Sequence, residues 1–340
     1  MAHLRLGLAA TVGLAAALLL TAGPAGAAAA LDKDNKRSAK RDQDLLLVRP
    51  VMGLSTVDLT FSPKNPKTPG GDTHEVTWEP NSALKVGARA GYGPFLATVT
   101  VDWRSREAEE THGKSTGVEL QFTGTARLDG HEVAGTVFFQ RYHGFFLSNT
   151  QDLFPGAGSP LLAPRLSLTT YGVSFLFFTD PNFSYDDAFV EYRPKEHGEA
   201  SWAFRVAMGH LGFDANSNAL MPGKFASDFN DAFGLNYLDA TYASAGIGFG
   251  ADWRPFGRVL LGLSGFVGAT FAATTHRIMG YERYAPAVGP SASFQAVAGW
   301  SGDLIHWGFM LSGDQEGLRI EGTDISSVRA SALLFFGLTF

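Results

Sequence analysis

Apolar and polar side chains alternate along most of the chain from Leu47 onward, which is the period of a β-strand. In the stretch 118–128, Val, Leu, Phe, Gly, Ala and Leu occupy the even positions, and Glu, Gln, Thr and Arg occupy the odd ones. The stretches 95–104 and 241–254 alternate in the same way. Each segment therefore has one apolar face and one face that is compatible with water, which predicts a sheet whose two sides meet different environments.

Thirteen segments are predicted to be strands, and most have about ten residues or more, the length that crosses a bilayer when a strand is tilted. They are 48–61, 82–92, 95–104, 116–128, 131–142, 166–178, 184–193, 200–213, 241–254, 257–272, 289–301, 304–313 and 327–340. Short links are expected at 93–94, 129–130, 180–182, 255–256 and 302–303, and long ones at 62–81, 105–114, 143–165, 273–288 and 314–326.

A closed membrane barrel explains these segments better than two rival architectures. The run Val259–Thr275 is long enough to be considered as a membrane helix, but its neighbours alternate and carry charges. A soluble β-sandwich normally carries Lys on its exposed face, whereas Lys beyond the first 46 residues occurs only at 64, 67, 85, 114, 195 and 224, nearly all of them in connections. The fold predicted is an all-β, antiparallel, up-and-down transmembrane barrel.

The number of strands must be even in a bacterial barrel formed by one chain. The succession of short and long links is regular except between about 184 and 240, so either one candidate there is not a crossing strand or the stretch 232–242 contains another strand. Twelve strands are predicted, with fourteen as the alternative. The last strand alternates up to Phe340 and is expected to pair with the first, because unpaired backbone groups are costly in hydrocarbon. Aromatic residues expected to form interfacial girdles are Trp103, Trp202, Trp253, Trp300, Trp307 and Phe340.

The N-terminal region predicts export. A basic start, an apolar run and a small-residue A-x-A site at 25–27 indicate a signal peptide over 1–27, followed by a charged periplasmic linker over 28–46 and the barrel over 47–340. The predicted location is the outer membrane of a Gram-negative bacterium. The expected partners are outer-membrane lipid, periplasmic chaperones and the barrel assembly machinery, for which Phe340 would be the signal.

Composition adds three constraints. The chain has no Cys, so disulfides do not stabilise it. A net charge of −6 over 340 residues does not favour nucleic acid, which requires a basic face. Scattered histidines without ligand spacing, and the lack of a Gly-rich phosphate loop, predict neither a metal site nor a cofactor.

Charged residues inside strands are expected to face the lumen, since an Arg at the lipid-facing midplane costs about 2–4 kcal/mol. They could line an aqueous channel, or they could pair and fill a narrow barrel. The candidates are Asp102, Arg104, Glu119, Arg127, Arg205, Asp252, Arg254 and Arg258.

Two stretches within 118–222 resemble blocks of an uncharacterised outer-membrane family known as a domain of unknown function. The stretch 138–149 resembles its Q-x-Y-K-G-F-Y-L block, and the stretch beginning at Asn182 resembles its K-F-S-Y-K-A-A-F-x-Q block. The matching residues are Gln140, Tyr142, Gly144, Phe145, Phe146, Leu147, Phe183, Ser184, Tyr185 and Phe189. Lysines of the family are replaced by His143, by Asp186 and within 195–197. The resemblance implies the compartment and the fold, and it implies no activity.

Catalysis has little support in the sequence. His143 and Ser148 are close enough in the chain to suggest a base and a nucleophile, but no acid is evident to orient the His. Asp186 and Asp187 are adjacent, so on a strand they would point to opposite faces. The preferred hypothesis is a non-enzymatic barrel that is structural or binds ligands through the outer loops 143–165 and 214–240. A small pore or transporter is the alternative, followed by an embedded lipid hydrolase.

Overall fold

The computed structural model describes residues 46–63, 74–82, 84–190, 198–216, 220–229, 232–253, 258–302 and 305–339. The predicted signal peptide, the linker up to residue 45 and Phe340 lie outside these residues. No helix among the described residues is both long and apolar enough to span a membrane.

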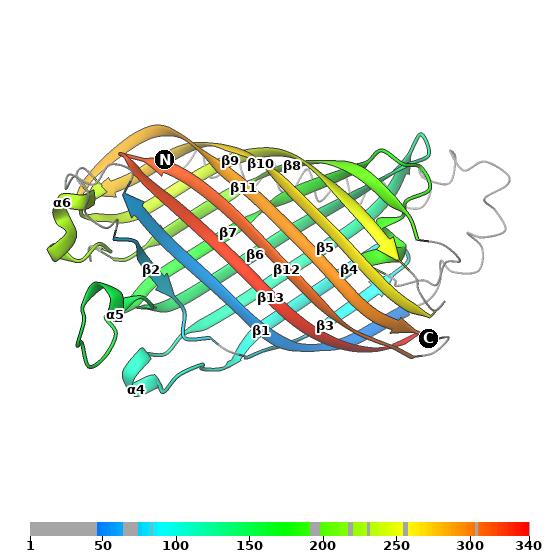
Figure 1. The fold of residues 1–340 in the computed structure, drawn as a ribbon, viewed down its shortest axis with the longest axis horizontal. Coiled ribbons are helices and arrows are strands. Elements are labelled where there is room, and N and C mark those ends of the chain that lie inside the picture. The colour runs from blue at the N-terminus through cyan, green and yellow to red at the C-terminus, as the bar shows by residue number, and fades with distance from the viewer. Residues whose placement is uncertain are drawn as a thin grey trace, which may run out of the picture.

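The described residues form one antiparallel sheet of 13 strands that closes on itself (Figure 1). The strands are β1 (Leu46–Pro63), β2 (Val76–Glu79), β3 (Leu84–Tyr92), β4 (Phe95–Arg104), β5 (Thr116–Leu128), β6 (His131–Leu147), β7 (Leu162–Phe178), β8 (Ala200–Asp214), β9 (Leu235–Trp253), β10 (Val259–Ile278), β11 (Tyr281–Ser301), β12 (Ile305–Ile320) and β13 (Thr323–Thr339). Short helical segments lie in connections: α4 (Glu109–His112), α5 (Thr150–Leu153), α6 (Ala226–Phe229), a 3₁₀ turn (Gly223–Phe225) and a π-helical segment (Asp186–Val190).

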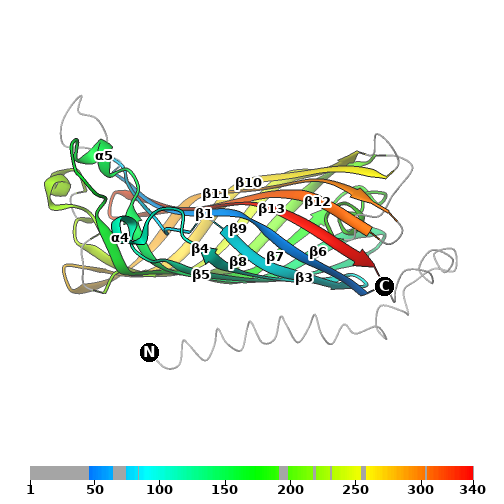
Figure 2. The ribbon, with the colours of Figure 1, turned by 90° about the horizontal axis from the view of Figure 1, so that it is seen from below.

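The barrel closes in two ways at its two ends. At the end away from β2, β1 pairs with β3 and β5 pairs with β6. Every strand except the four-residue β2 therefore belongs to a ring of twelve there. We call this the lower section, and it confirms the prediction of twelve. At the other end, β2 pairs with both β1 and β6 and so replaces β3, β4 and β5 in the ring. We call this the upper section. The longer connections lie at its end of the barrel, which we call the outer end (Figure 2).

The closing pair is β1 with β13, from Leu47 opposite Thr339 to Pro63 opposite Thr323. The predicted pairing of the last strand with the first is therefore confirmed, and no sheet edge is left at this seam. Side chains alternate between lumen and exterior on both strands. On β13, Leu334, Phe336 and Leu338 are exposed, while Leu333 and Phe335 are buried.

A belt of exposed apolar side chains surrounds the lower section, as lipid contact requires. Its members include Met52, Leu54, Val99, Val101, Leu120, Phe204, Val206, Ile247, Phe249, Leu263, Val267, Phe294, Phe309, Leu334 and Phe336. Trp202, Trp253 and Trp307 are exposed near the inner end, and Trp103 is exposed at the outer end of β4. Because a soluble sheet would bury such a surface, the belt identifies the lower section as the part that spans the membrane.

One predicted strand is wrong. The described part of segment 184–193, residues 184–190, does not join the sheet, because Asp186–Val190 is a short π-helical segment in the connection between β7 and β8. The side chains of Phe183, Tyr185 and Phe189 are buried. Their apolar character, which resembled a strand face in the sequence, serves to pack this segment against the inside of the barrel wall.

Two predicted long links are also wrong. Residues 273–288 and 314–326 are mostly strand, and they belong to hairpins that turn at Met279-Gly280 and at Glu321-Gly322. Met279 and Glu321 each have a φ of 49°, and the following glycines also have positive φ, which is the geometry of tight hairpin turns. β9, β10 and β11 consequently reach 19, 20 and 21 residues.

Candidate functional site

Two apolar clusters occupy the two ends of the barrel interior. The inner core packs the segment after β7 against lumen-facing residues of the wall; it includes Phe178, Phe183, Tyr185, Phe189, Leu260, Phe266, Val297, Met310, Leu333 and Phe335. The outer core fills the upper section; it includes Val57, Leu59, Phe61, Trp78, Phe145, Leu147, Leu153, Leu166, Leu168, Phe213, Leu220, Leu235, Leu238, Leu318 and Ile320.

Glycines on the wall make room for the inner core. A Cβ placed on Gly250 would lie 2.8 Å from Cζ of Phe183, and one on Gly262 would lie 3.3 Å from Cε1 of Phe189. The segment is held by polar contacts as well. The Tyr185 hydroxyl donates to Gln295 Oε1 at 2.9 Å, and the Asp186 backbone N–H donates to Glu132 Oε1 at 2.8 Å. The inner end is therefore filled by part of the chain itself.

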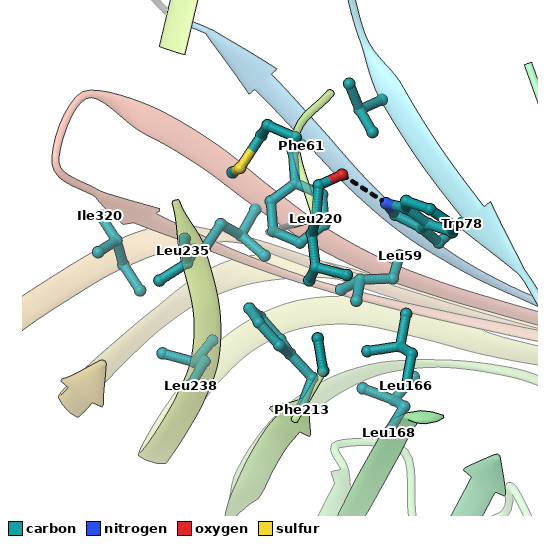
Figure 3. Close-up of a cluster of buried hydrophobic side chains, with 14 of the residues drawn as sticks. Leu59, Phe61, Trp78, Leu166, Leu168, Phe213, Leu220, Leu235, Leu238 and Ile320 are labelled. Atoms are coloured by element: carbon teal, nitrogen blue, oxygen red, sulfur yellow. Dashed lines mark hydrogen bonds between the residues drawn. The ribbon is translucent and has the colours of Figure 1, made fainter. Parts of the chain in front are cut away.

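The outer core is shown in Figure 3, where side chains from β1, β7, β8, β9 and the end of β12 converge with Trp78 and Leu220. Trp78 Nε1 donates to the Leu220 carbonyl at 3.1 Å, which ties β2 to the connection between β8 and β9. Loop residues such as Leu153, Met221 and Phe229 also turn inward and are buried. The connections that the sequence suggested as free binding loops thus contribute much of their apolar surface to this closure.

Polar side chains occupy the lumen between the two cores. Arg205 lies 3.7 Å from Glu316 and 3.9 Å from Asp314, and Thr270 donates to Glu316 at 2.6 Å. Arg329 lies with its guanidinium 5.7 Å from the ring centre of Phe138. A cavity of about 80 Å³ lies beside them. Opposite charges in this layer are close enough to compensate one another in a medium of low dielectric constant.

A second polar group lies at the level where the two sections meet. The Lys85 ammonium, whose side chain is 1% exposed, donates to Glu119 and to the Tyr142 hydroxyl. Tyr142 also donates to Glu119, and Thr100 donates to the other Glu119 oxygen at 3.1 Å. Asp102 Oδ1 lies 3.9 Å from the Lys85 nitrogen. We call Lys85, Asp102, Glu119 and Tyr142 the junction cluster.

A cleft of about 690 Å³ opens above the junction cluster at the outer end of β4 and β5. It is bordered by Asn81, by β4 residues 102–104, by the connection 105–109 and by residues 114–116. The cleft exists because β3, β4 and β5 stop at this level while their neighbours continue. Trp103 and Arg104 are exposed beside it, whereas Asp102 points inward.

The eight charged residues predicted for the lumen are placed differently from one another. Asp102, Glu119 and Arg205 lie in the lumen networks described above. Asp252 is buried at the inner end and accepts the Glu199 backbone N–H at 2.8 Å. Arg104 and Arg127 are exposed near strand ends, Arg258 is exposed with its guanidinium 5.9 Å from the Trp300 ring centre, and Arg254 lies outside the described residues.

Several lumen residues were missed by the sequence reasoning. Lys85 lies within the predicted strand 82–92, which the structure confirms as β3, but it is absent from the lumen candidates, as are Arg89, Glu132, Asp314, Glu316 and Arg329. Position parity was the available signal. Lys85 and Arg89 alternate with exposed Ala88 and Ala90, so they belong to the opposite face of their strand.

The family-block residues divide between three parts of the interior. Tyr142 belongs to the junction cluster, and Phe145, Phe146 and Leu147 are buried at the outer end of β6. Gly144 lies between Tyr142 and Phe145 in the chain and has a φ of 79°, at the point where the register of β6 against β7 shifts. Gln140 lines the polar layer. Phe183, Ser184, Tyr185 and Phe189 belong to the inner end, with Ser184 buried.

The suggested hydrolytic pair does not form a catalytic arrangement among the described residues. His143 is exposed on β6, and Ser148 donates to the Thr77 carbonyl at 3.1 Å. No hydrogen bond joins His143 to Ser148 in this part of the chain. Asp186 and Asp187 lie on the π-helical segment rather than on a strand. Within the described ranges, no three His, Asp or Glu residues gather in a way that could hold a metal ion.

Comparison with solved structures finds outer-membrane proteins with low sequence identity. The outer membrane protease OmpT of Escherichia coli is 7% identical, with a TM-score of 0.37, and the match covers 88% of this chain and 97% of OmpT. The toluene transporter TodX of P. putida is 8% identical, with a TM-score of 0.31 and coverages of 87% and 90%. The β-domain of the Bordetella autotransporter BrkA is 13% identical, with a TM-score of 0.33 and coverages of 82% and 98%.

No curated protein matches the sequence significantly. A family model described as a domain of unknown function, DUF4421, matches residues 39–334, which is most of the chain. The family suggested by the two sequence blocks is thereby supported over a much longer stretch than the blocks themselves. The architecture on which this match falls is a closed barrel with a lipid-compatible exterior. The chain belongs to the family described as a domain of unknown function, DUF4421.

Proposed function

We propose that the protein is a non-conducting barrel of the outer membrane that acts as a binding platform through its outer end. The observation that carries this proposal is the filling of the lumen at both ends by apolar side chains. A solute crossing the barrel would have to displace Phe183 and Phe189 at one end and Leu59 and Phe61 at the other, all of them at most 1% exposed.

The same physics supports the proposed location. The closed ring of the lower section and its exterior belt of apolar side chains suit a bilayer, and a closed barrel is one of only two backbone arrangements that hydrocarbon tolerates. The upper section carries charged residues outside, including Arg277, Glu282, Arg319 and Asp324. These support its exposure to water beyond the membrane, where a platform would meet its ligand.

The pore hypothesis has one supporting feature, the polar layer between the two cores. Arg205, Glu316 and Arg329 resemble the lining of an aqueous path, but this layer is bounded by apolar cores in both directions. A pore would therefore require both cores to rearrange. We rank it second for this reason, and we do not propose the hydrolase.

Single-channel recording in planar bilayers tests the proposal. We expect the purified full chain to insert without stable conductance steps, in bilayers where a porin inserted under the same conditions produces them. Insertion would be verified by protease protection of the lower section. Reproducible steps from the inserted chain would overturn the non-conducting assignment. Sedimentation of the cellular protein with outer-membrane rather than inner-membrane markers would test the location separately.

A further inference from the structure

The wall of the barrel is incomplete beside the cleft. The ladder between β4 and β5 ends at Val101 opposite Val118, yet β4 continues to Arg104. At the same level, Thr116 and Gly117 of β5 pair only with β6 among the described strands. The β4 residues beyond Val101 thus separate from β5, and the cleft lies at this separation.

The outer border of the cleft is held in place by hydrogen bonds. Asn81 is 1% exposed, and its side-chain amide donates to the carbonyls of Glu107 at 3.1 Å and Gly113 at 2.9 Å. Its side-chain oxygen accepts the Glu107 backbone N–H at 2.8 Å. Its own backbone N–H donates to Ser115 Oγ at 2.7 Å, and Ser115 donates to the Gly144 carbonyl. One buried side chain therefore fixes both ends of the connection that forms the border, which keeps the cleft preformed.

The floor of the cleft contains a carboxylate that has few donors. The Asp102 side chain is 7% exposed and borders the cleft, and the Ser82 hydroxyl is a neighbouring donor, but neither Asp102 oxygen has a well-formed hydrogen bond among the described residues. The nearest cation, Lys85, is 3.9 Å away and already donates to Glu119 and Tyr142. Buried polar groups are nearly always hydrogen-bonded, so Asp102 is suited to receive a donor from a ligand.

The mouth of the cleft has the opposite charge. Arg104 and Lys114 border it, are exposed, and form no ion pair within the described part of the chain. Trp103 is 68% exposed and follows the lipid-facing Val99 and Val101 on β4, which places it at the outer membrane–water interface. A ligand in the cleft would meet cations at the mouth, an anion at the floor, and lipid beside it.

We propose that the cleft binds a lipid headgroup that carries a phosphate and a primary ammonium, as in phosphoethanolamine. The ammonium would donate to Asp102, and the phosphate would lie against Arg104 and Lys114. An anionic headgroup without an ammonium would leave Asp102 without a donor, and a cation alone would leave Arg104 and Lys114 unpaired. The proximity of Trp103 to the lipid-facing wall favours a membrane lipid over a soluble ligand. This inference rests on the proposed function in assigning the working surface to the outer end.

Lipid retention tests the proposal. The full chain would be reconstituted in vesicles that contain equal amounts of ethanolamine and choline phospholipids with matched acyl chains, extracted gently, and examined by native mass spectrometry. We expect the wild type to retain the ethanolamine lipid about tenfold more than the choline lipid, since a quaternary ammonium cannot donate a hydrogen bond to Asp102. Equal retention of the two lipids would overturn the proposal.

Variants separate recognition from folding. Asp102→Asn is expected to abolish the preference between the two lipids, and Arg104→Ala with Lys114→Ala to lower retention of both, because these two exposed side chains face the phosphate. Asp239→Asn, at a half-buried position on β9 outside the cleft lining, is the matched control and should retain the preference. Heat-modifiable migration on gels would show that each variant is folded. A folded Asp102→Asn protein that keeps the wild-type preference would contradict the proposal.

Free phosphoethanolamine distinguishes the source of the headgroup. We expect millimolar amounts to reduce retention of the ethanolamine lipid only partly, since the acyl chains add contacts along the wall. If the free compound bound the protein in the absence of any lipid preference, the membrane source would be rejected. Conductance is measured separately from lipid retention. A conducting pore would overturn the proposed function without changing lipid retention. Equal retention of the two lipids by a non-conducting barrel would overturn only this inference.

Discussion

The lower and upper sections use the same strands with opposite chemistry. On β10, Leu263, Val267 and Phe271 of the lower section point outward, and Ser264 and Thr270 point into the lumen. On β1 of the upper section, Val57, Leu59 and Phe61 are buried inside, and Asp58 and Thr60 lie on the other face. The interior of the lower section contains the polar layer as well as the inner core, whereas the interior of the upper section is filled mainly by apolar side chains.

This difference shows that the same strands can form a membrane-type barrel over one part of their length and a soluble-type barrel over another. Lipid accepts apolar side chains outside, so the lower section can place its charges inside, where they compensate one another. The upper section has water outside and must be stabilised by burial, like a soluble domain. The change from one arrangement to the other occurs where β3, β4 and β5 end and β2 takes their place, which is also the position of the junction cluster and the cleft.

The largest expected effect on the free energy of unfolding comes from removing the positive charge of the junction cluster. Lys85→Met leaves Glu119 and Asp102 without their cation, and loss of one partner from a buried ion pair costs about 3–5 kcal/mol. We expect a corresponding fall in the free energy of unfolding, measured by urea titration in detergent.

Two variants complete that test. Lys85→Met combined with Glu119→Gln should recover part of the lost stability, because one uncompensated carboxylate is removed. Arg319→Ala breaks an exposed ion pair with Asp324 in the upper section, and it should leave the unfolding midpoint unchanged. A Lys85→Met protein as stable as the wild type would show that the junction cluster is not needed to join the two sections.

Gly144→Ala is expected to have an intermediate effect, because this glycine lies where β6 passes from β5 to β2. Its φ of 79° costs a residue with a side chain about 1–2 kcal/mol, and an added Cβ would also collide with the Lys114 carbonyl. Gly156→Ala is the matched control, since Gly156 has a φ of 87° but no atom within 4 Å of the added Cβ. Equal losses of unfolding free energy in the two variants would argue against a packing constraint at the junction.

Trp78→Phe should have the smallest effect and reports on the upper section. The substitution removes the donor to the Leu220 carbonyl while it keeps most of the apolar contact, so we expect a loss of about 1 kcal/mol. The loss should appear as earlier proteolysis of the connection between β8 and β9, with the unfolding of the lower section unchanged. Simultaneous loss of both sections at the same urea concentration would mean that they unfold as one unit.

Sequence alternation predicted the strands of the lower section well, and it failed where the chemistry of the two faces reverses. The sequence predicts links at 273–288 and 314–326, but strands form there with Ile278, Leu318 and Ile320 on the inner face. The outward apolar pattern stops in these strands, where Arg277 and Arg319 are on the outer face. Segment 184–193 is predicted as a strand because its apolar residues resemble a lipid-facing strand face. In the structure these residues are buried against the inside of the wall instead. Local periodicity reports burial but does not say what buries the residue.

The candidate site was only partly predictable. Asp102, Glu119 and Arg205 were expected in the lumen from their positions on alternating strands, but the sequence did not pair them with partners. Lys85 meets Glu119 across an intervening strand, and Arg205 meets Glu316 from β8 to β12, so these contacts depend on how the ring closes. The cleft depends on where three strands end relative to β2, which no single segment encodes.

By itself, the sequence determined that this chain forms a closed membrane barrel, because a period of two with one lipid-compatible face leaves few other ways to satisfy the backbone, but it left the strand number open between twelve and fourteen. The tertiary structure alone decided that the lumen is filled, that β2 closes the upper section, and that Asp102 lies at the floor of an interfacial cleft. These features are set by contacts between strands far apart in the chain. The free energy of such contacts depends on register and ring closure, which local patterns do not contain.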